Sequence, residues 1–218
     1  MTRPHRIQTL RAAAPDRKPL QRAIKRGVDL LGAGFGLLIL GPVLAAAALL
    51  VLVLDGRPVL FVQDRAGLDG RPFRIVKFRT MRVGADAERA LLRSRNEVAG
   101  GASFKLSDDP RISRSGRWLR RTSIDELPQL WNILIGDMSL VGPRPHPFDD
   151  VAGYSDWHFR RLSVKPGLTG LWQISARSNP DFDTWVNLDL EYIDSWSLAL
   201  DLRIIAGTIP ALLRTDGR

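Results

Sequence analysis

Residues 30–54 form a run of 25 residues without a charged side chain. At a rise of ~1.5 Å per residue, a helix of this length would exceed the ~30 Å hydrocarbon core of a bilayer. A water-soluble domain rarely covers such a helix on all faces, so we expect membrane contact. A cleaved signal peptide is disfavoured, because its apolar core is only ~7–15 residues long and a small-residue cleavage site should follow it.

The course of this helix through the membrane is open from the residues alone. Gly41 and Pro42 lie near its middle, where proline removes a hydrogen bond and favours a kink or break. Both flanks are basic, so the positive-inside rule chooses no direction. A kinked span and a helix that turns at Gly41-Pro42 and returns both fit. Asp29, which follows Lys25 and Arg26, fits either a helical ion pair or a place in the headgroup layer.

Charge and cysteine content narrow the function classes. Thirty-two basic and 23 acidic residues give a net charge of +9. This balance favours an anionic partner: a nucleic acid, a phosphorylated small molecule or an acidic lipid surface. The chain has no cysteine, which excludes disulfides and thiol nucleophiles. Its three histidines have no HExxH spacing, so the sequence gives little support to a zinc hydrolase.

The remaining sequence predicts an α+β fold, mostly helical with short strands. We expect a basic flexible arm (1–20) that touches anionic lipid, a membrane helix (21–56) and a catalytic domain with interfacial helices (57–218). Within that domain the patterns predict strands at 59–63 and 73–78, helices at 85–95, 127–135, 185–193 and 196–209, a polar loop at 96–109, and no regular helix at 141–147. The last helix is apolar on nearly every face and should lie on the membrane or under the body.

An acidic pair carries the strongest chemical signal. Asp125 and Glu126 follow Ser123, which has the spacing of a capping box with Glu126 and could begin a helix. Alternatively, the helix begins at Pro128 and the pair lies in the preceding turn. In an arbitrary sequence this pattern would more often be a capping box with a surface ion pair. A carboxylate pair can also supply a nucleophile together with a metal ligand or a proton-transfer group.

The cations near this pair suit a diphosphate. They are Lys77, Arg79, Arg111, Arg117, Arg120, Arg121 and Arg144. Mg²⁺ takes oxygen ligands from carboxylate, phosphate and water, so Asp125 and Glu126 are also candidate metal ligands. No P-loop can bind the phosphates instead: the glycines at 32, 34 and 36 miss the G-x-G-x-x-G pattern, because position 37 is leucine.

These motifs together resemble the bacterial sugar transferase family, the monotopic phosphoglycosyl transferases that begin exopolysaccharide or related glycan assembly on polyprenyl phosphate. The blocks that carry the resemblance are 25–29 (KRGVD), 77–81 (KFRTM), 109–112 (DPRI), 121–129 (RTSIDELPQ), 136–145 (GDMSLVGPRP) and 165–173 (KPGLTGLWQ). Each block is moderately specific, and their order along most of the chain makes the set strongly so.

The resemblance implies a mechanism and a location. Asp125 matches the nucleophile that attacks the β-phosphorus of a UDP-sugar, releases UMP and holds the sugar phosphate covalently until undecaprenyl or another polyprenyl phosphate accepts it. Glu126 matches its partner, implicated in Mg²⁺ binding or proton transfer, and Arg144, between Pro143 and Pro145, matches a nucleotide contact. The resemblance also implies a re-entrant helix hairpin broken near Pro42, at the cytoplasmic face of a bacterial inner membrane.

The sequence also leaves some questions open. Ala176 replaces a glycine that relatives often have, and residues 192–202 are similar to members that transfer glucose or galactose phosphate. A membrane-tethered module that binds nucleic acid or acidic lipid is a competing hypothesis, but no nucleic-acid motif is present and we expect no nucleic-acid partner. A scaffold that kept the fold without activity is a third. A homo-oligomer is compatible with the sequence.

Overall fold

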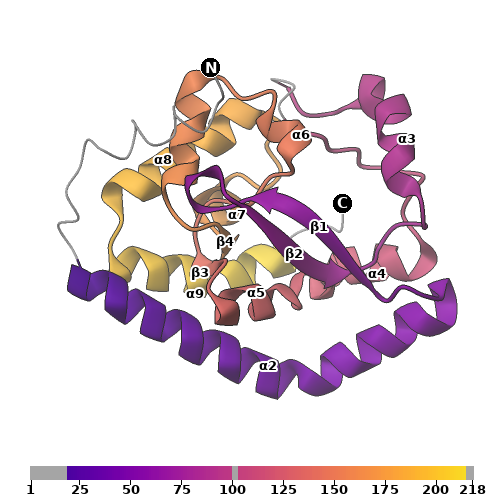
Figure 1. Ribbon diagram of the computed structural model, residues 1–218, viewed down its shortest axis with the longest axis horizontal. Helices are drawn as coiled ribbons and strands as arrows, with labels where there is room; N and C mark the ends of the chain where they lie inside the picture. The colour runs from indigo at the N-terminus through magenta and orange to yellow at the C-terminus, as the bar shows by residue number, and fades with distance from the viewer. Residues whose placement is uncertain (1–18, 100–102, 215–218) are drawn as a thin grey trace.

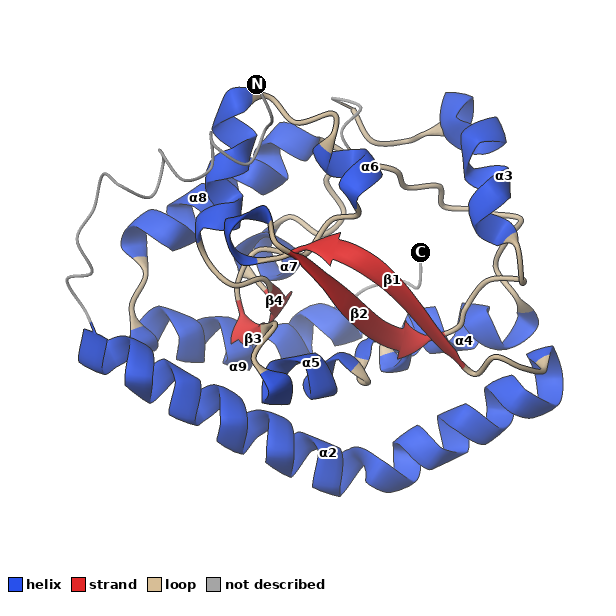
Figure 2. Ribbon diagram, in the orientation of Figure 1, coloured by secondary structure: helices blue, strands red, loops and turns tan. Residues whose placement is uncertain are grey.

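The computed structural model describes residues 19–99 and 103–214, and it confirms a mostly helical α+β fold (Figures 1 and 2). The α-helices are α2 (Pro19–Asp55), α3 (Ala85–Leu92), α4 (Arg114–Thr122), α5 (Gln129–Ile135), α6 (Phe148–Val151), α7 (Leu171–Ser175), α8 (Phe182–Ser195) and α9 (Leu198–Arg214). The strands are β1 (Leu60–Ala66), β2 (Pro72–Phe78), β3 (Ser139–Val141) and β4 (Gly167–Thr169). Short 3₁₀ helices are η1 (Leu68–Gly70), η2 (Arg93–Arg95), η3 (Ile124–Glu126) and η4 (Asp156–Ser163).

The predicted strands and helices are found close to their expected places. The helix expected at 85–95 is α3 followed by the 3₁₀ turn η2, and the two terminal helices are longer than expected. Residues 139–147 hold a short strand and a proline-rich turn, as their composition requires. Most of the expected basic arm, residues 1–18, lies outside the described residues, and Pro19 already begins α2.

The long helix α2 is continuous through Pro42 and bends near its middle (Figure 1). Its first arm buries Ala33 in a cluster that contains Ile133 of α5, and its second arm buries Val51 against Leu119 of α4. Each arm therefore has its own apolar partners on one body. The structure shows a bent helix rather than two antiparallel helices, because the two contacts lie far apart along that body.

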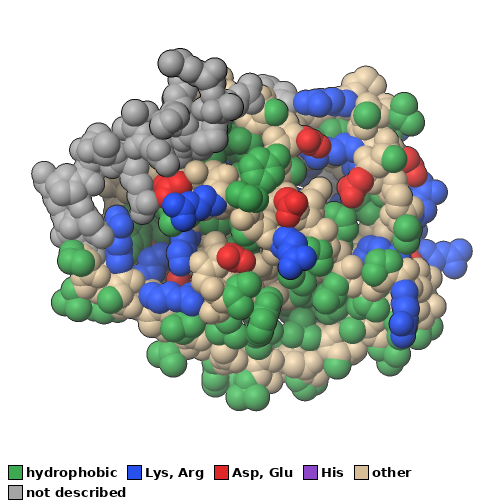
Figure 3. Space-filling view, viewed as in Figure 1, with side chains coloured by type: hydrophobic (Ala, Val, Ile, Leu, Met, Phe, Trp, Pro, Cys, Tyr) green, Lys and Arg blue, Asp and Glu red, His purple; other side chains and the backbone are tan. Residues whose placement is uncertain are grey.

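The outer face of α2 is apolar and uncovered. Its exposed large side chains include Leu31, Phe35, Leu38, Ile39, Val43, Leu49, Leu52, Val53 and Leu54. They belong to the apolar edge at the bottom of the space-filling view (Figure 3). Within the described residues, α2 is the helix that is long and apolar enough to cross a membrane.

Polar contacts attach the first arm of α2 to the body. Lys25 Nζ donates to Asp201 (2.8 Å) and to the carbonyl of Val141 (3.0 Å). The buried carboxylate of Asp29 accepts from the Ser139 hydroxyl (2.9 Å) and from the Leu140 amide (2.8 Å). Both expectations for Asp29, an ion pair within its helix and a place in the headgroup layer, are corrected, because the open edge of β3 offers it two donors.

Arg79 attaches the second arm. Its guanidinium donates to the carbonyls of Asp55, Gly56 and Arg57, where α2 ends. The last carbonyls of a helix have no partners within it, and a cation is favoured at that end. The Asp55 carboxylate accepts from Ser113 Oγ (2.7 Å) at the start of α4. The two ends of α2 are thus fixed to the same body.

The body contains two small sheets of two strands each. β1 and β2 are antiparallel, and Phe61 pairs with Lys77, so the two side chains share one face. β3 and β4 are parallel. Gly167 of β4 lies very close to Gly142, at the start of the proline-rich turn. Only glycine fits at position 167, because a Cβ there would come within 2.1 Å of the Gly142 nitrogen.

We predict that Asp29→Ala lowers the stability of the fold. The substitution leaves the Ser139 hydroxyl and the Leu140 amide buried without an acceptor, which should cost about 1–3 kcal/mol. Thermal unfolding of the protein in lipid nanodiscs measures the loss as a lower Tm. Asp64→Ala, on the exposed side of β1, is the matched control and should leave Tm unchanged; an equal fall in both variants would contradict the prediction.

Candidate active site

The acidic pair lies in a 3₁₀ turn between two helices. Ser123 ends α4 in the left-handed conformation (φ 56°), and its hydroxyl caps no helix. Asp125 and Glu126 occupy η3, and Pro128 stands directly before α5. Of the two alternatives, the helix that begins at Pro128 is therefore correct and the capping box is wrong. The left-handed residue allows the chain to turn sharply, which places the pair at an element end.

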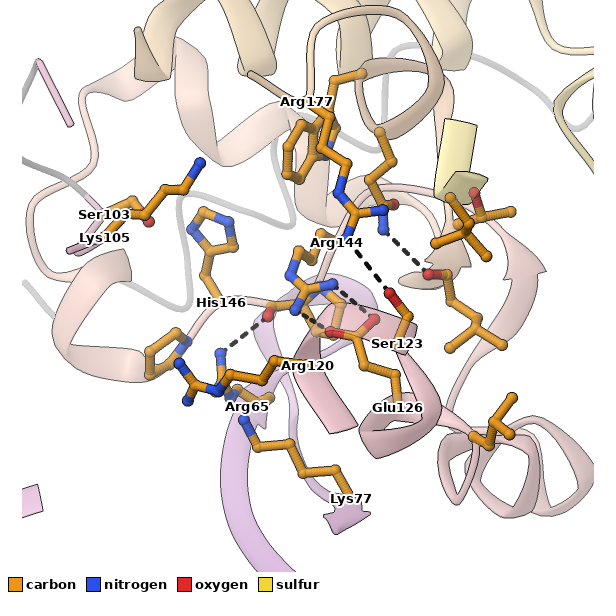
Figure 4. A pocket seen from close by; sticks show the side chains of 18 of the residues that line it. Arg65, Lys77, Ser103, Lys105, Arg120, Ser123, Glu126, Arg144, His146 and Arg177 are labelled. Carbon is orange, nitrogen blue, oxygen red and sulfur yellow. Dashed lines mark hydrogen bonds and ion pairs between the residues drawn. The ribbon is translucent and has the colours of Figure 1, made fainter. Parts of the chain in front are cut away.

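A cavity of about 870 Å³ lies beside this turn. Its polar part is drawn in Figure 4, where Arg65, Lys77 and Arg120 lie on one side of Glu126 and Arg177 approaches from the other. The cations that line the cavity are Arg65, Lys77, Arg89, Lys105, Arg111, Arg120, Arg144 and Arg177. The lining carboxylates are Asp86, Asp109, Glu126 and Asp150. Cations exceed carboxylates, so the cavity favours an anion.

Glu126 forms a two-pronged ion pair with Arg144. Arg144 Nη1 donates to one carboxylate oxygen at 3.1 Å, and Nη2 donates to the other (Figure 4). Such paired contacts suit the planar guanidinium and are strong. Burial alone would raise the pKa of Glu126, but the charge and hydrogen bonds of Arg144 outweigh it and lower the pKa to about 2. Glu126 is therefore ionised at neutral pH.

Asp125 has a different environment. It is 6% exposed, and its carboxylate accepts no hydrogen bond from any residue that the structure describes. Burial and the neighbouring charge of Glu126 raise its pKa to about 6, against the opposing influence of Lys77, Arg120 and Arg144. Asp125 itself is not among the residues that line the cavity, whereas Glu126 beside it lines the cavity together with Lys77 and Arg120. A carboxylate with unused oxygens close to cations is suited to nucleophilic attack.

Desolvated cations surround the pair. Burial and neighbouring arginines lower the pKa of Lys77 to about 8. Burial and the charge of Arg144 lower the pKa of Arg65 to about 10. A bound diphosphate would relieve this repulsion, because its negative charge would favour the protonated cations. The cluster therefore favours the binding of an anion.

Of the substrate-binding residues predicted from the sequence, some line the cavity and others lie outside its lining. Arg120, Arg144 and Lys77 line the cavity with Pro145, and Arg111 lines it while paired with Asp109 (2.6 Å). Pro143 is buried and lines a smaller cleft instead. Arg79 instead caps α2, as described above, and lies outside the cavity lining, as do Arg117 and Arg121, which are exposed on α4.

The helical period explains this division on α4. Arg117 and Arg121 are four residues apart and share one face of the helix. Arg120 lies on another face, where its Nε donates to the hydroxyl of Thr80 (2.9 Å), two residues after β2 ends. Which face meets the cavity depends on how α4 packs, and the local sequence does not contain that information.

Several cavity residues were not predicted, among them Arg65, Arg177 and His146. Arg65 lies on the same face of β1 as Phe61 and Gln63, so strand alternation with Lys77 could have found it. Arg177 follows α7 and donates to Ser123 Oγ (3.4 Å). His146 is buried, and its Nδ1 has no partner among the described residues. No sequence signal pointed to Arg177 or His146, because both reach the cavity through tertiary packing.

The acidic pair offers oxygen atoms of the kind that a metal ion binds. Among the described residues, no group of three or more histidine, aspartate or glutamate side chains could hold a metal ion. Magnesium often uses only one or two carboxylates, with water and substrate phosphates as its other ligands. Asp125 offers oxygens without hydrogen bonds, while both oxygens of Glu126 accept from Arg144. The donor chemistry fits a substrate-borne Mg²⁺ and provides no complete protein cage.

The sequence model of the family described as bacterial sugar transferase matches residues 20–215. The chain belongs to the bacterial sugar transferase family. The match covers the acidic turn, every cation of the cavity and the helices that frame them. The family expected from the sequence motifs is thus confirmed.

Curated relatives support the same assignment. A galactosyl transferase, CpsE, of Streptococcus agalactiae is 49% identical over 88% of this chain and 43% of its own length. The undecaprenyl-phosphate galactose phosphotransferase of Salmonella typhimurium is 39% identical over 98% of this chain and 45% of its own length. The exopolysaccharide production protein ExoY of Rhizobium meliloti is 40% identical over 92% of this chain and 90% of its own length. The chain thus spans less than half of the first two relatives and most of the third.

We predict that Asp125→Asn stabilises the protein at pH 8. Because the pKa is raised, ionisation of Asp125 costs stability progressively as the pH rises from about 4, the ordinary pKa, to about 6, and asparagine removes that cost of order 1–3 kcal/mol at pH 8. At pH 5 the unfolded chain is already ionised at this position while the native carboxyl is mostly protonated, so only part of the cost is present and the gain should be smaller than at pH 8. Thermal unfolding at both pH values measures the difference in Tm, and a gain independent of pH would contradict the electrostatic origin.

Proposed function

We propose that this chain transfers a sugar 1-phosphate from a UDP-sugar to polyprenyl phosphate, as the first step of exopolysaccharide or related glycan assembly. The observation that carries the proposal is the acidic turn beside a cation-rich cavity, in a chain of the bacterial sugar transferase family. Relatives named for UDP-galactose, UDP-glucose and undecaprenyl phosphate support these substrate classes.

The first step uses Asp125 as nucleophile. Its carboxylate oxygen forms a bond to the β-phosphorus, and the bond from that phosphorus to the bridging oxygen breaks, so UMP leaves with the bridging oxygen and the electron pair. The aspartyl sugar phosphate remains on the enzyme. The positive charges of Lys77 and Arg120 act on Asp125 and lower its pKa. The same two charges would neutralise the diphosphate during the attack.

The second step regenerates the enzyme. A phosphate oxygen of polyprenyl phosphate bonds to the same phosphorus, and the bond to Asp125 breaks. The product is a polyprenyl diphosphate sugar, and the aspartate returns as a carboxylate. Arg144 would hold Glu126 ionised throughout, and the positive charges of Lys77, Arg120 and Arg144, which lower the pKa of Asp125, would stabilise the negative charge that returns to the departing aspartate.

Asp125 and Glu126 would hold a magnesium ion together with diphosphate oxygens. When bound, Mg²⁺ supplies charge neutralisation at the phosphates. The chain's own contribution is to present the carboxylates from one turn and to surround the remaining phosphate oxygens with Arg65, Lys77 and Arg120.

The attachment of α2 supports a proposal for how the protein lies in the membrane. Both ends of this helix bind one polar body, so we propose that α2 enters the bilayer and returns as a re-entrant helix, with its bend near Pro42 deepest. Its exposed apolar face would contact lipid chains, and basic residues near both ends would contact anionic headgroups. Because nucleotide sugars are cytosolic, the body would lie on the cytoplasmic face of the inner membrane.

The transferred sugar is proposed as glucose or galactose phosphate. The similarity of residues 192–202 to members with these substrates motivates the choice, and several relatives carry one of the two sugars in their names.

We predict that incubation with the matching UDP-sugar and Mg²⁺, without lipid acceptor, adds the mass of one sugar phosphate to the protein. Intact-mass analysis across a panel of UDP-sugars should identify the sugar. Asp125→Asn should abolish the adduct, because asparagine is not a nucleophile here, while Glu126→Gln should slow its formation at least tenfold. Asp64→Asn, on the exposed side of β1, is the matched control. An adduct that survives in Asp125→Asn would refute this nucleophile.

We also predict that both ends of α2 lie on the same side of the membrane. The chain contains no cysteine, so single cysteines at Gln21 and Asp64, both exposed, can be labelled selectively. A membrane-impermeant maleimide should label both positions in inside-out vesicles and neither in sealed spheroplasts. Labelling of the two positions from opposite sides would establish a single span instead.

A further inference from the structure

The cavity that contains Glu126 and Arg144 has a second end that is apolar. Its lining continues between the two apolar helices of the molecule, α2 and α9. The residues at this end are Gly36 and Leu40 of α2, Leu140, Leu168 and Ile174 of the body, and Ile205, Thr208, Ile209 and Leu212 of α9. A single space thus connects a cluster of cations with a passage between hydrophobic walls.

The helix spacing makes this apolar wall continuous. Ile205, Thr208, Ile209 and Leu212 follow the i, i+3, i+4, i+7 pattern of one face of α9. Thr208 is the polar member, and its hydroxyl is used within the protein, because it lies 2.8 Å from the Thr169 hydroxyl and donates to the Ile204 carbonyl (2.7 Å). The wall therefore presents little unsatisfied polarity to an occupant.

The apolar end opens toward the membrane side of the molecule. Ile209 lines the cavity and yet is 66% exposed, so it lies where the cavity opens to the surface, here called the mouth. Leu40 on the opposite wall belongs to the stretch of α2 whose neighbours Leu38 and Ile39 are exposed and apolar. A chain that leaves through this mouth would meet the lipid-facing surface of α2.

We propose that the passage between α2 and α9 holds the prenyl chain of the acceptor, with its phosphate at the Arg144 end. This inference rests on the proposed function and adds the place where the lipid binds. The acceptor combines one anionic end with a long apolar chain, and the cavity combines the same two chemistries in the same order. A nucleotide sugar has no apolar chain to match these walls, so it would occupy the polar part.

The test separates the two half-reactions in the protein reconstituted in nanodiscs. Ile209→Glu places a carboxylate at the apolar mouth. Leu202→Glu is the matched control, because Leu202 lies on the same helix, is 60% exposed and is outside the cavity lining. UMP release in the absence of acceptor should be unchanged in both variants. Transfer to undecaprenyl phosphate should fall at least tenfold in Ile209→Glu and less than threefold in Leu202→Glu.

A series of acceptors with two, three and eleven isoprene units sharpens the test. The defect of Ile209→Glu should grow with chain length, since a short chain does not reach the mouth. Equal defects at all lengths, or equal defects in the two variants, would show that α9 only anchors the protein and would overturn the inference. Ile209→Ala, which keeps the wall apolar, should retain most transfer, and unchanged UMP release in Ile209→Glu excludes misfolding as the cause of its defect.

Photocrosslinking gives a readout that does not depend on turnover. A polyprenyl phosphate with a diazirine in its chain should label residues 36–40 and 205–212, and excess undecaprenyl phosphate should compete. Labelling elsewhere, or labelling equally competed by bulk phospholipid, would overturn the inference. If the unmodified protein releases no UMP from any UDP-sugar, the proposed function itself is refuted. Failure of the lipid-binding inference and failure of the proposed function are therefore distinguishable.

Discussion

The attachment of both ends of α2 to one polar body is the constraint on which the architecture depends. Lys25 and Asp29 hold one arm, and Arg79 satisfies the carbonyls at the end of the other. Each contact is buried or partly buried, where charge-assisted hydrogen bonds are strong and costly to leave unmade. An apolar helix that is held in this way cannot leave the body, so the body must remain at the surface of whatever apolar phase the helix enters.

The second constraint is electrostatic. Two adjacent carboxylates in one turn cannot both be equally ionised at low cost, and Arg144 resolves the conflict by pairing with Glu126. Burial and the charge of Glu126 raise the pKa of Asp125, which destabilises the fold at neutral pH, and its carboxylate oxygens accept no hydrogen bond from the described residues. A site that sacrifices stability for an available carboxylate is typical of functional positions. The cations of the cavity are likewise desolvated, and an anion would relieve them.

Sequence patterns predicted the helices and strands well where one pattern of apolar residues is enough to decide the type of element. The uncharged run became α2, and the two alternating segments became β1 and β2. The patterns were ambiguous where two local rules compete, as at Ser123, which had capping-box spacing but adopts a left-handed turn. They were also insufficient for cations such as Arg79, whose type suited a phosphate but whose position at the end of α2 gave it carbonyl partners.

The sequence by itself determined the family, the apolar helix and the acidic pair, because these depend on residue types and spacings along the chain. Only the tertiary structure decided that the two arms of α2 bind one body and that Arg65 and Arg177 join Arg144 around Glu126. It also decided that α2 and α9 border one passage. These features arise from contacts between segments far apart in sequence, and the free energy of such contacts depends on packing geometry that local patterns do not encode.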